Sequence, residues 1–164
     1  MLATVDAYNI SLFLHISAVV IGFGATYAEA IMFPVALKVS NQHLPYVHRL
    51  AMAINQRLAT PAMVVILITG IYQVAEDKGR GWEFGDPWVS ATFLILIVLG
   101  GLIGGYFVPT DRKLAEMAER DLASSSGEMS AEYQAGAKRI GALGGLAGVL
   151  VLVAIFLMVT KPGA

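Results

Sequence analysis

Four long apolar stretches divide the chain, and each is long enough to cross a lipid bilayer as a helix. They cover residues 10–37, 58–75, 88–108 and 140–160. Roughly 20 apolar residues in a helix span the hydrocarbon core, so each stretch has about the right length. The pattern predicts an all-α polytopic membrane protein, a four-transmembrane-helix up-down bundle that forms one domain over residues 1–164.

One face of the first stretch is small and polar. Read at alternating spacings of three and four residues, this face consists of Tyr8, Ser11, His15, Ala18, Gly22, Ala25, Glu29, Met32 and Ala36. A histidine or a glutamate against lipid tails would cost several kcal/mol, so we expect the face to look into the bundle. His15 and Glu29 lie about 21 Å apart along the helix axis and therefore share the face without touching.

The second helix should begin outside the hydrocarbon core. Pro45 suits the first turn of a helix, and the following residues are amphipathic until the sequence becomes apolar at Leu58. Pro61 lacks an amide hydrogen and its ring clashes with the preceding turn, so we expect a bend there. His43 and His48 fall in the polar part of this segment, which places them on the cytoplasmic surface.

Signals for helix ends frame the rest of the chain. Asp86 followed by Pro87 predicts the start of the third span, and Pro109 predicts its end. Residues 111–123 can form an amphipathic cytoplasmic helix, and Ser130 can cap the last helix. The apolar side of the amphipathic helix consists of Leu114, Met117 and Ala118.

Glycines recur at spacings of three and four residues in the last two spans. They are Gly100, Gly101, Gly104, Gly105, Gly141, Gly144, Gly145 and Gly148. Such small-xxx-small patterns let helix backbones approach closely. They predict either a dimerisation face or packing inside the bundle, and we favour packing because four adjacent spans must bury something against each other.

The composition agrees with a membrane protein. Apolar residues make up 57% of the 164 residues and charged residues 14%, and the mean hydropathy is +0.68. These values lie outside the range of ordinary soluble domains. The absence of cysteine excludes disulfides, thiolate ligands and cysteine nucleophiles. No basic patch is interleaved with aromatic residues, so the expected partner is the lipid bilayer and not nucleic acid.

The distribution of lysine and arginine predicts the orientation in the membrane. Eight of these residues lie in the first and third loops: Lys38, Arg49, Arg57, Arg112, Lys113, Arg120, Lys138 and Arg139. Only Lys78, Arg80 and Lys161 lie on the opposite side. Because positive residues concentrate in cytoplasmic loops, we expect a multi-pass protein of the cell (inner or plasma) membrane with both termini outside.

Glu29 and Arg57 form the first candidate site. In an antiparallel arrangement Glu29 is level with about Ala53, so the long side chain of Arg57 can reach it. The two residues then form either a proton or ion site or a structural ion pair that fixes helix register. The sequence favours neither interpretation.

His15 forms the second candidate site, near the outer end of the first span and level with Ser90 and Thr92. An imidazole inside a bundle is a possible axial ligand for haem iron, and the small residues Ala18 and Gly22 leave room for a flat macrocycle. Alternatively, His15 is hydrogen-bonded to Ser90 or Thr92 and binds no cofactor. No phosphate-binding loop, paired-histidine zinc motif or serine-histidine-acid constellation is visible.

Several short motifs resemble known membrane proteins. They are His15-Ile16, Phe23-Gly24, Arg57-Leu58-Ala59-Thr60-Pro61-Ala62-Met63, Thr69-Gly70 and Lys161-Pro162. The motifs resemble four-helix membrane proteins related to the HemJ-type protoporphyrinogen oxidase and to the CopD copper-resistance membrane domain. The chain looks closest to a family of small integral membrane proteins of unknown function.

The resemblance implies a possible haem site. His15 matches the histidine proposed as a haem ligand in the HemJ-type oxidases, which would make it a metal ligand for haem b. The lysine of their third helix, a few residues after a tryptophan, is best matched by Thr92 after Trp88, and a histidine of that helix is replaced by Ser90. The resemblance therefore implies the fold most strongly, a haem less so, and the oxidation of protoporphyrinogen least.

Three functions remain open. The protein is a haem-associated redox membrane protein, and if it is an enzyme it is a membrane oxidoreductase. Alternatively, it is a non-catalytic partner or assembly subunit, as a homodimer or within a larger membrane complex. The third possibility is a small proton-coupled transporter in which Glu29 changes protonation, although four helices are few for such a path.

Overall fold

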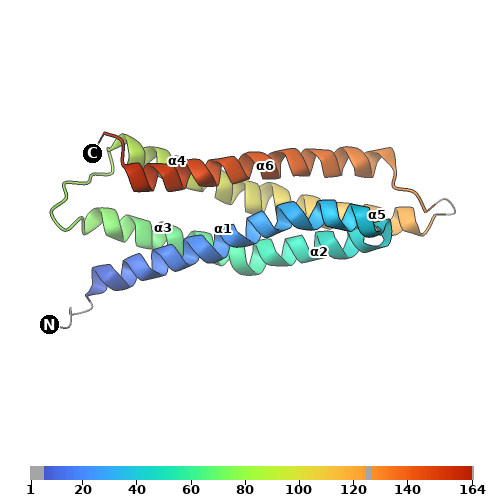
Figure 1. Ribbon diagram of the computed structural model, residues 1–164, viewed down its shortest axis with the longest axis horizontal. Helices are drawn as coiled ribbons and strands as arrows, with labels where there is room; N and C mark the ends of the chain where they lie inside the picture. The colour runs from blue at the N-terminus through green and yellow to red at the C-terminus, as the bar shows by residue number, and fades with distance from the viewer. Residues whose placement is uncertain (1–5, 125–126, 164) are drawn as a thin grey trace.

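The computed structural model describes residues 6–124 and 127–163, and the regular elements in this part of the chain are helices without any strand. They form four long rods, which lie side by side along one axis (Figure 1). Each rod is long and apolar enough to cross a membrane. The prediction of an all-α polytopic bundle with four spans is therefore confirmed.

Two of the rods are single helices and two are composite. The first rod is α1 (Ala7–Val39) and the fourth is α6 (Ala131–Thr160). The second rod consists of η1 (Asn41–His43), α2 (Leu44–Ile54), η2 (Asn55–Ala59) and α3 (Thr60–Ala75). The third rod consists of α4 (Pro87–Leu102), η3 (Ile103–Phe107) and α5 (Val108–Leu122).

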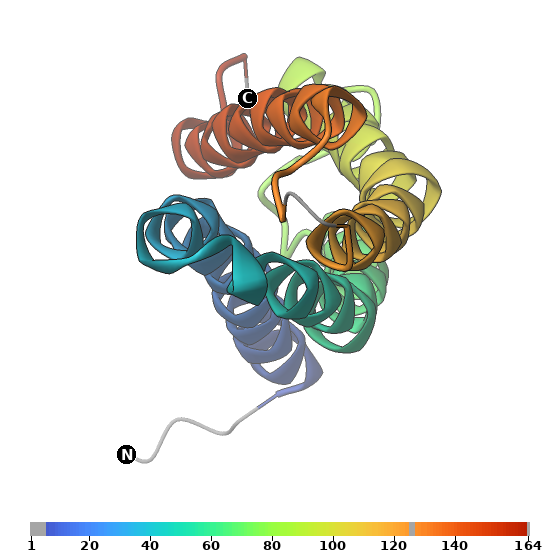
Figure 2. The same ribbon diagram turned by 90° about the vertical axis from the view of Figure 1, so that its right-hand side faces the viewer.

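The rods pack differently in the two halves of the bundle. We call the end that holds the start of α1, the end of α6 and the loop of residues 76–86 the terminal end. In that half α1 packs mainly on α3 and α4 mainly on α6, so the helices form two pairs. In the opposite half, which faces the viewer in Figure 2, α2 packs on α5 between α1 and α6. The two pairs leave space between them toward the terminal end.

The change in packing coincides with two wide helical turns. Both η2 and η3 are π-helical, and they contact each other at the same depth in the bundle. Each is followed by a proline, Pro61 or Pro109. A π turn widens the helix, which relieves the clash of a proline ring with the carbonyl of the preceding turn. The expectation that Pro109 stops the helix is therefore wrong, because the helix continues through η3 into α5.

Other predicted features of the loops hold in the structure. Pro45 lies in the first turn of α2, and the Ser130 hydroxyl caps α6 by accepting a hydrogen bond from the Tyr133 amide. Asp86 is the N-cap of α4 through its backbone only, because its carboxylate accepts from the Glu83 amide instead. The predicted amphipathic helix of residues 111–123 is part of the third rod, and its apolar side, Leu114, Met117 and Ala118, is buried.

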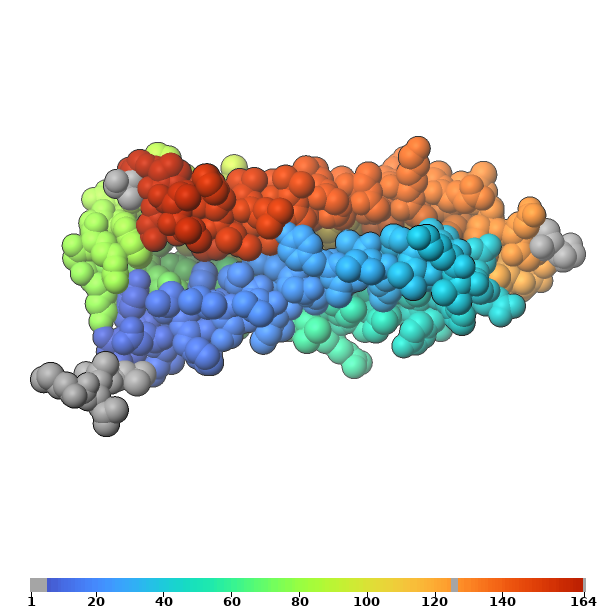
Figure 3. Space-filling view, in the orientation of Figure 1, coloured from blue at the N-terminus to red at the C-terminus, as the bar shows by residue number. Residues whose placement is uncertain are grey.

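Much of the outer surface is apolar, as expected for a bundle surrounded by lipid. Large exposed side chains such as Phe13, Ile97 and Val159 lie along the rods, each more than 60% exposed. Figure 3 shows the long, narrow surface that the rods present on one side. Six glycines of the third and fourth rods face outward. A Cβ at any of these positions would have no atom of the described residues within 4 Å, apart from its own helix: Gly101, Gly104, Gly105, Gly141, Gly144 and Gly145. The expectation that these glycines pack inside the bundle is wrong for these six.

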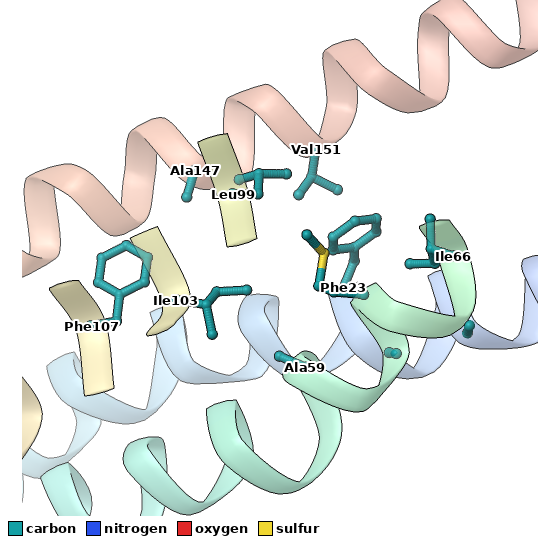
Figure 4. Close-up of a cluster of buried hydrophobic side chains, with 11 residues drawn as sticks. Phe23, Ala59, Ile66, Leu99, Ile103, Phe107, Ala147 and Val151 are labelled. Carbon is teal, nitrogen blue, oxygen red and sulfur yellow. The ribbon is translucent and has the colours of Figure 1, made fainter. Parts of the chain in front are cut away.

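The buried core lies where all four rods meet. Phe23 of α1 packs with side chains from the other three rods, as Figure 4 shows. These side chains include Ala59, Ile66, Leu99, Ile103, Phe107, Ala147 and Val151. Gly22 allows α1 to approach the second rod, because a Cβ at this position would lie 2.7 Å from the Ala62 Cβ. This core closes the floor of the space between the two helix pairs.

Candidate functional site

A cavity of about 560 Å³ lies between the two helix pairs at the terminal end. In Figure 3 the surface is hollowed between α1 and α6 near this end. Apolar side chains make up most of the wall, and the residues that bring polar atoms are Tyr8, His15, Gln73, Arg80, Trp82, Trp88, Thr92 and Lys161. Pockets for small molecules and cofactors have volumes of about 300–1,000 Å³ and similar walls. The cavity is therefore large enough to be a ligand site.

His15 is held in the cavity wall by the second rod. Its Nδ1 lies 2.8 Å from the Thr69 hydroxyl oxygen, and that hydroxyl donates its own hydrogen to the Val65 carbonyl. The Thr69 oxygen therefore accepts a hydrogen bond from Nδ1–H, which leaves the lone pair of the ring on Nε2. The Ile66 backbone also forms a hydrogen bond with the ring, and among the described residues no side chain bonds to Nε2. Gly70 packs on the ring, since a Cβ there would lie 3.5 Å from His15 Cε1.

The alternative partners expected for His15 are engaged elsewhere. The Ser90 hydroxyl donates to the Phe84 carbonyl, and the Thr92 hydroxyl donates to the Trp88 carbonyl at 2.7 Å. The expectation of a hydrogen bond from His15 to Ser90 or Thr92 is therefore wrong, because α1 packs on α3 while α4 lies across the cavity. The structure nevertheless brings His15 and Thr92 together as wall residues of one cavity.

Two cations line the cavity beside aromatic rings. The Arg80 guanidinium lies 5.0 Å from the centre of the Trp82 ring, and Lys161 Nζ lies 4.8 Å from the same ring. Arg80 also lies 5.1 Å from the Tyr8 ring, so these contacts join the loop to α1 and to the end of α6. Trp88 is 6% exposed, and its Nε1–H has no acceptor within residues 6–124 and 127–163. The wall thus offers two positive charges and one unused donor.

The loop that carries Arg80 is organised by Asp77. Its carboxylate accepts hydrogen bonds from the backbone amides of Gly79, Gly81 and Trp82, at 2.9, 2.6 and 3.1 Å. These hydrogen bonds hold the pKa of Asp77 below its usual range, and the bond from Gly79 has the largest effect. A folded loop of this kind positions Arg80 and Trp82 beside the cavity.

An ion pair ties the loop to the start of α1. Lys78 donates a hydrogen bond to the Asp6 carboxylate, and this bond lowers the pKa of Asp6. The same carboxylate caps α1 by accepting from the Asn9 amide at 2.9 Å. Both partners are more than 40% exposed, so the pair contributes little stability. Its effect is to hold the loop beside Tyr8.

A second polar group lies in the opposite half of the bundle. His48 is fully buried, with Nδ1 2.8 Å from Asp111 Oδ1 and Nε2 2.9 Å from the Tyr133 hydroxyl. The expectation that His48 lies on the surface is wrong, because α5 and α6 cover this face of α2. One sequence signal could have found it, since Leu44, His48, Ala51 and Asn55 recur at spacings of three and four residues and are all buried.

Glu29 contacts Asn55 instead of Arg57. Asn55 Nδ2 lies 3.4 Å from each carboxylate oxygen of Glu29, whereas the Arg57 side chain is exposed. Within the described part of the chain no ion pair joins Glu29 to Arg57. The sequence predicts Glu29 to lie level with about Ala53, which is within one helical turn of Asn55. It does not show that η2 turns Asn55 inward and Arg57 outward. The predicted ion pair is therefore wrong.

Comparison with known proteins places the chain in a family context. A family model described as "Predicted integral membrane protein (DUF2269)" matches residues 9–162. No curated protein and no solved structure matches the chain. The family match agrees with the expected resemblance to a small membrane protein family, while the relationship to HemJ-type and CopD-type proteins stays a prediction.

Proposed function

The chain belongs to the DUF2269 family of predicted integral membrane proteins, and from this premise we propose that it is a haem-associated redox protein that binds haem b in the cavity at the terminal end. The observation that carries the proposal is the environment of His15. A histidine that ligates a metal donates its other ring N–H to a fixed acceptor, which sets the tautomer and the ring orientation. Thr69 is that acceptor here, and His15 is a residue of the cavity wall whose Nε2 forms no hydrogen bond with a described side chain.

The rest of the cavity suits the two kinds of surface that a haem presents. Its apolar walls would accommodate the macrocycle, and the positive charges of Arg80 and Lys161 in the wall would pair with the propionate groups. The unused Nε1–H of Trp88 can donate to one of those carboxylates, which would satisfy a buried donor that otherwise costs about 1–3 kcal/mol. Haem, when bound, supplies one-electron redox chemistry at its iron.

Thr92 lies across the cavity from His15 but is a poor second ligand. Its hydroxyl donates to the Trp88 carbonyl, and a neutral hydroxyl is a much weaker ligand for iron than a lysine or histidine nitrogen. We therefore propose that His15 would be the strong ligand of the iron, whereas Thr92 would only line the cavity. Because the lysine of HemJ-type oxidases is absent at this position, the proposal covers haem binding and not the oxidation of protoporphyrinogen.

The visible spectrum of the detergent-purified protein tests this proposal. Protein from haem-replete cells should show a haem absorbance band that His15→Ala weakens or abolishes, because the iron loses its imidazole ligand. The matched control is His43→Ala, which removes an exposed imidazole outside the cavity and should leave the band unchanged. A colourless wild-type preparation, or equal bands in the wild type and His15→Ala, would contradict the proposal.

A second candidate is a non-catalytic subunit of a membrane complex. It is favoured by the outward-facing glycines of the third and fourth rods, which leave helix backbone open to a second copy of the chain. If two copies associate there, Gly104→Leu should shift the protein from dimer to monomer in mild detergent, whereas Gly24→Leu on α1, also exposed with no neighbour, should not. A monomeric wild type would argue against this candidate.

A further inference from the structure

The half of the bundle opposite the terminal end holds buried polar side chains that the proposed haem site does not use. The group consists of His48, Asn55, Asp111 and Tyr133, each less than 10% exposed, and of the half-buried Glu29 beside Asn55, whereas the buried Asp121 pairs with Arg120 outside the group. They come from all four rods. Ionisable residues inside a membrane bundle are costly, so their pairing and charge decide whether the bundle is stable there.

The charges of this group do not balance when both carboxyl groups are ionised. His48 is engaged by Asp111 and Tyr133, so at most it compensates Asp111. The lysines and arginines that form ion pairs in the described ranges are paired with other acids, and none of these pairs includes Glu29. Asp111 is also close enough to interact electrostatically with Glu29. An ionised Glu29 would therefore be an uncompensated charge beside another carboxyl group.

Asn55 supplies an independent observation. Its side chain is 1% exposed, and its Oδ1 has no hydrogen-bond partner among the described residues. Its Nδ2 lies 3.4 Å from both oxygens of Glu29, which is long for a hydrogen bond to a charged acceptor. An ionised carboxylate only accepts hydrogen bonds, so it cannot satisfy the Asn55 oxygen. A protonated carboxyl group has one O–H donor and can do so.

We propose that Glu29 and Asn55 form a proton-binding site, in which Glu29 carries a proton at neutral pH and shares it with Asn55. The acid O–H donates to Asn55 Oδ1, and Asn55 Nδ2–H donates to the other oxygen of Glu29. The resulting ring of two hydrogen bonds satisfies the buried oxygen and removes the uncompensated charge. The proton comes from water and returns to water, since Glu29 is only half-buried. Of the titratable groups, Asp111 on α5 interacts electrostatically with Glu29, and Asp111 is bonded to His48 on α2, which also contacts Tyr133 on α6.

Infrared spectroscopy of the purified full-length protein at neutral pH tests the proposal, because protonated carboxyl groups absorb separately from carboxylates and amides. The wild type should show a protonated-carboxyl band that is absent from Glu29→Gln, whose amide keeps both hydrogen bonds with Asn55. The matched control is Glu83→Gln, which removes an exposed glutamate of the loop and should leave the band in place. Identical protonated-carboxyl bands in the wild type and Glu29→Gln would overturn the proposal.

A second variant tests the role of Asn55. Asn55→Leu removes the partner and should shift the Glu29 band to the frequency of a carboxyl group without a hydrogen bond, or convert it into a carboxylate band. An unshifted band would show that Asn55 does not share the proton. If Asn55→Leu does not fold, the comparison of the wild type with Glu29→Gln still decides the protonation of Glu29. These spectra do not depend on haem, so they can fail independently of the proposed haem site.

Discussion

At the scale of single residues, the two polar side chains of α1 have different partners on the second rod. His15 bonds to the Thr69 hydroxyl through Nδ1, whereas Glu29 faces the amide of Asn55. His15 and Glu29 could be selected from the sequence because an ionisable side chain in an apolar span stands out. Thr69 and Asn55 could not, because the rotation of the second rod selects them and the wide η2 turn changes that rotation.

The exposure of Arg57 leads to a prediction at this scale. Arg57→Ala should change the free energy of unfolding by no more than about 0.5 kcal/mol, because exposed substitutions away from special features have small effects. Combined with Glu29→Gln, the two effects should add, since the side chains do not meet. Double-mutant cycles of unfolding in detergent measure this. A coupling energy above about 0.5 kcal/mol would show that Glu29 and Arg57 pair after all.

At the scale of the elements, the η2 and η3 turns and the loop of residues 76–86 shape the cavity. The two turns stand where the terminal half separates into helix pairs, and the loop adds Arg80 and Trp82 to the cavity wall. In the sequence, Pro61 and Pro109 indicated the positions of the two turns, and a charged, glycine-containing segment indicated the loop. The sequence did not show that the third helix continues through Pro109, because a proline alone does not reveal whether the preceding turn widens.

The loop should give a specific dependence of stability on pH. An aspartate in the unfolded chain has a pKa of about 3.9, and the backbone amides hold the pKa of Asp77 lower in the folded chain. The ionised loop therefore contributes stability above about pH 4, and this contribution is lost as the pH falls through the lower folded pKa. Asp77→Asn removes the titration, so the gap in thermal midpoint between wild type and variant should be constant from about pH 5 to 7 and shrink below pH 4.

The neighbouring glutamate provides the control for this loop. Glu76 is exposed, and its only hydrogen bond among the described residues runs from its backbone amide to the Tyr72 carbonyl. Glu76→Gln should therefore leave the pH dependence of the thermal midpoint as in the wild type. A gap for Asp77→Asn that widens at low pH would mean that the loop is not held by the Asp77 carboxylate.

At the scale of the whole molecule, the bundle is polarised between its ends. A cavity with two cations occupies the terminal end, and the buried His48, Asp111 and Tyr133 occupy the opposite half. The number of spans was predictable because four apolar stretches are separated by polar segments. The cavity was not, because its volume depends on how far the helix pairs separate, and no pattern along one helix records that distance. His48 was missed because its partners lie 63 and 85 residues away.

The excess of lysine and arginine predicts that the opposite end is cytoplasmic and the terminal end is outside. Since the chain has no cysteine, single cysteines can report on this orientation. Glu83→Cys in the 76–86 loop should react with an impermeant thiol reagent in intact cells, and Gln42→Cys in η1 should react only after the cells are permeabilised. Both side chains are exposed, so lack of access within the protein does not limit the reaction. The reverse pattern of labelling would show the opposite orientation.

The central claim is that His15 ligates haem iron, and chemical rescue with imidazole tests it most directly. His15→Gly removes the ring but leaves its space, so added imidazole can occupy the place of the missing side chain in the cavity wall. We expect His15→Gly to lose the haem absorbance band and free imidazole to restore it. Added imidazole should not change the band of Thr69→Val, which keeps the His15 ring. A band in His15→Gly that equals the wild type without imidazole, or a lost band that imidazole does not restore, would contradict the assignment of His15 as the ligand.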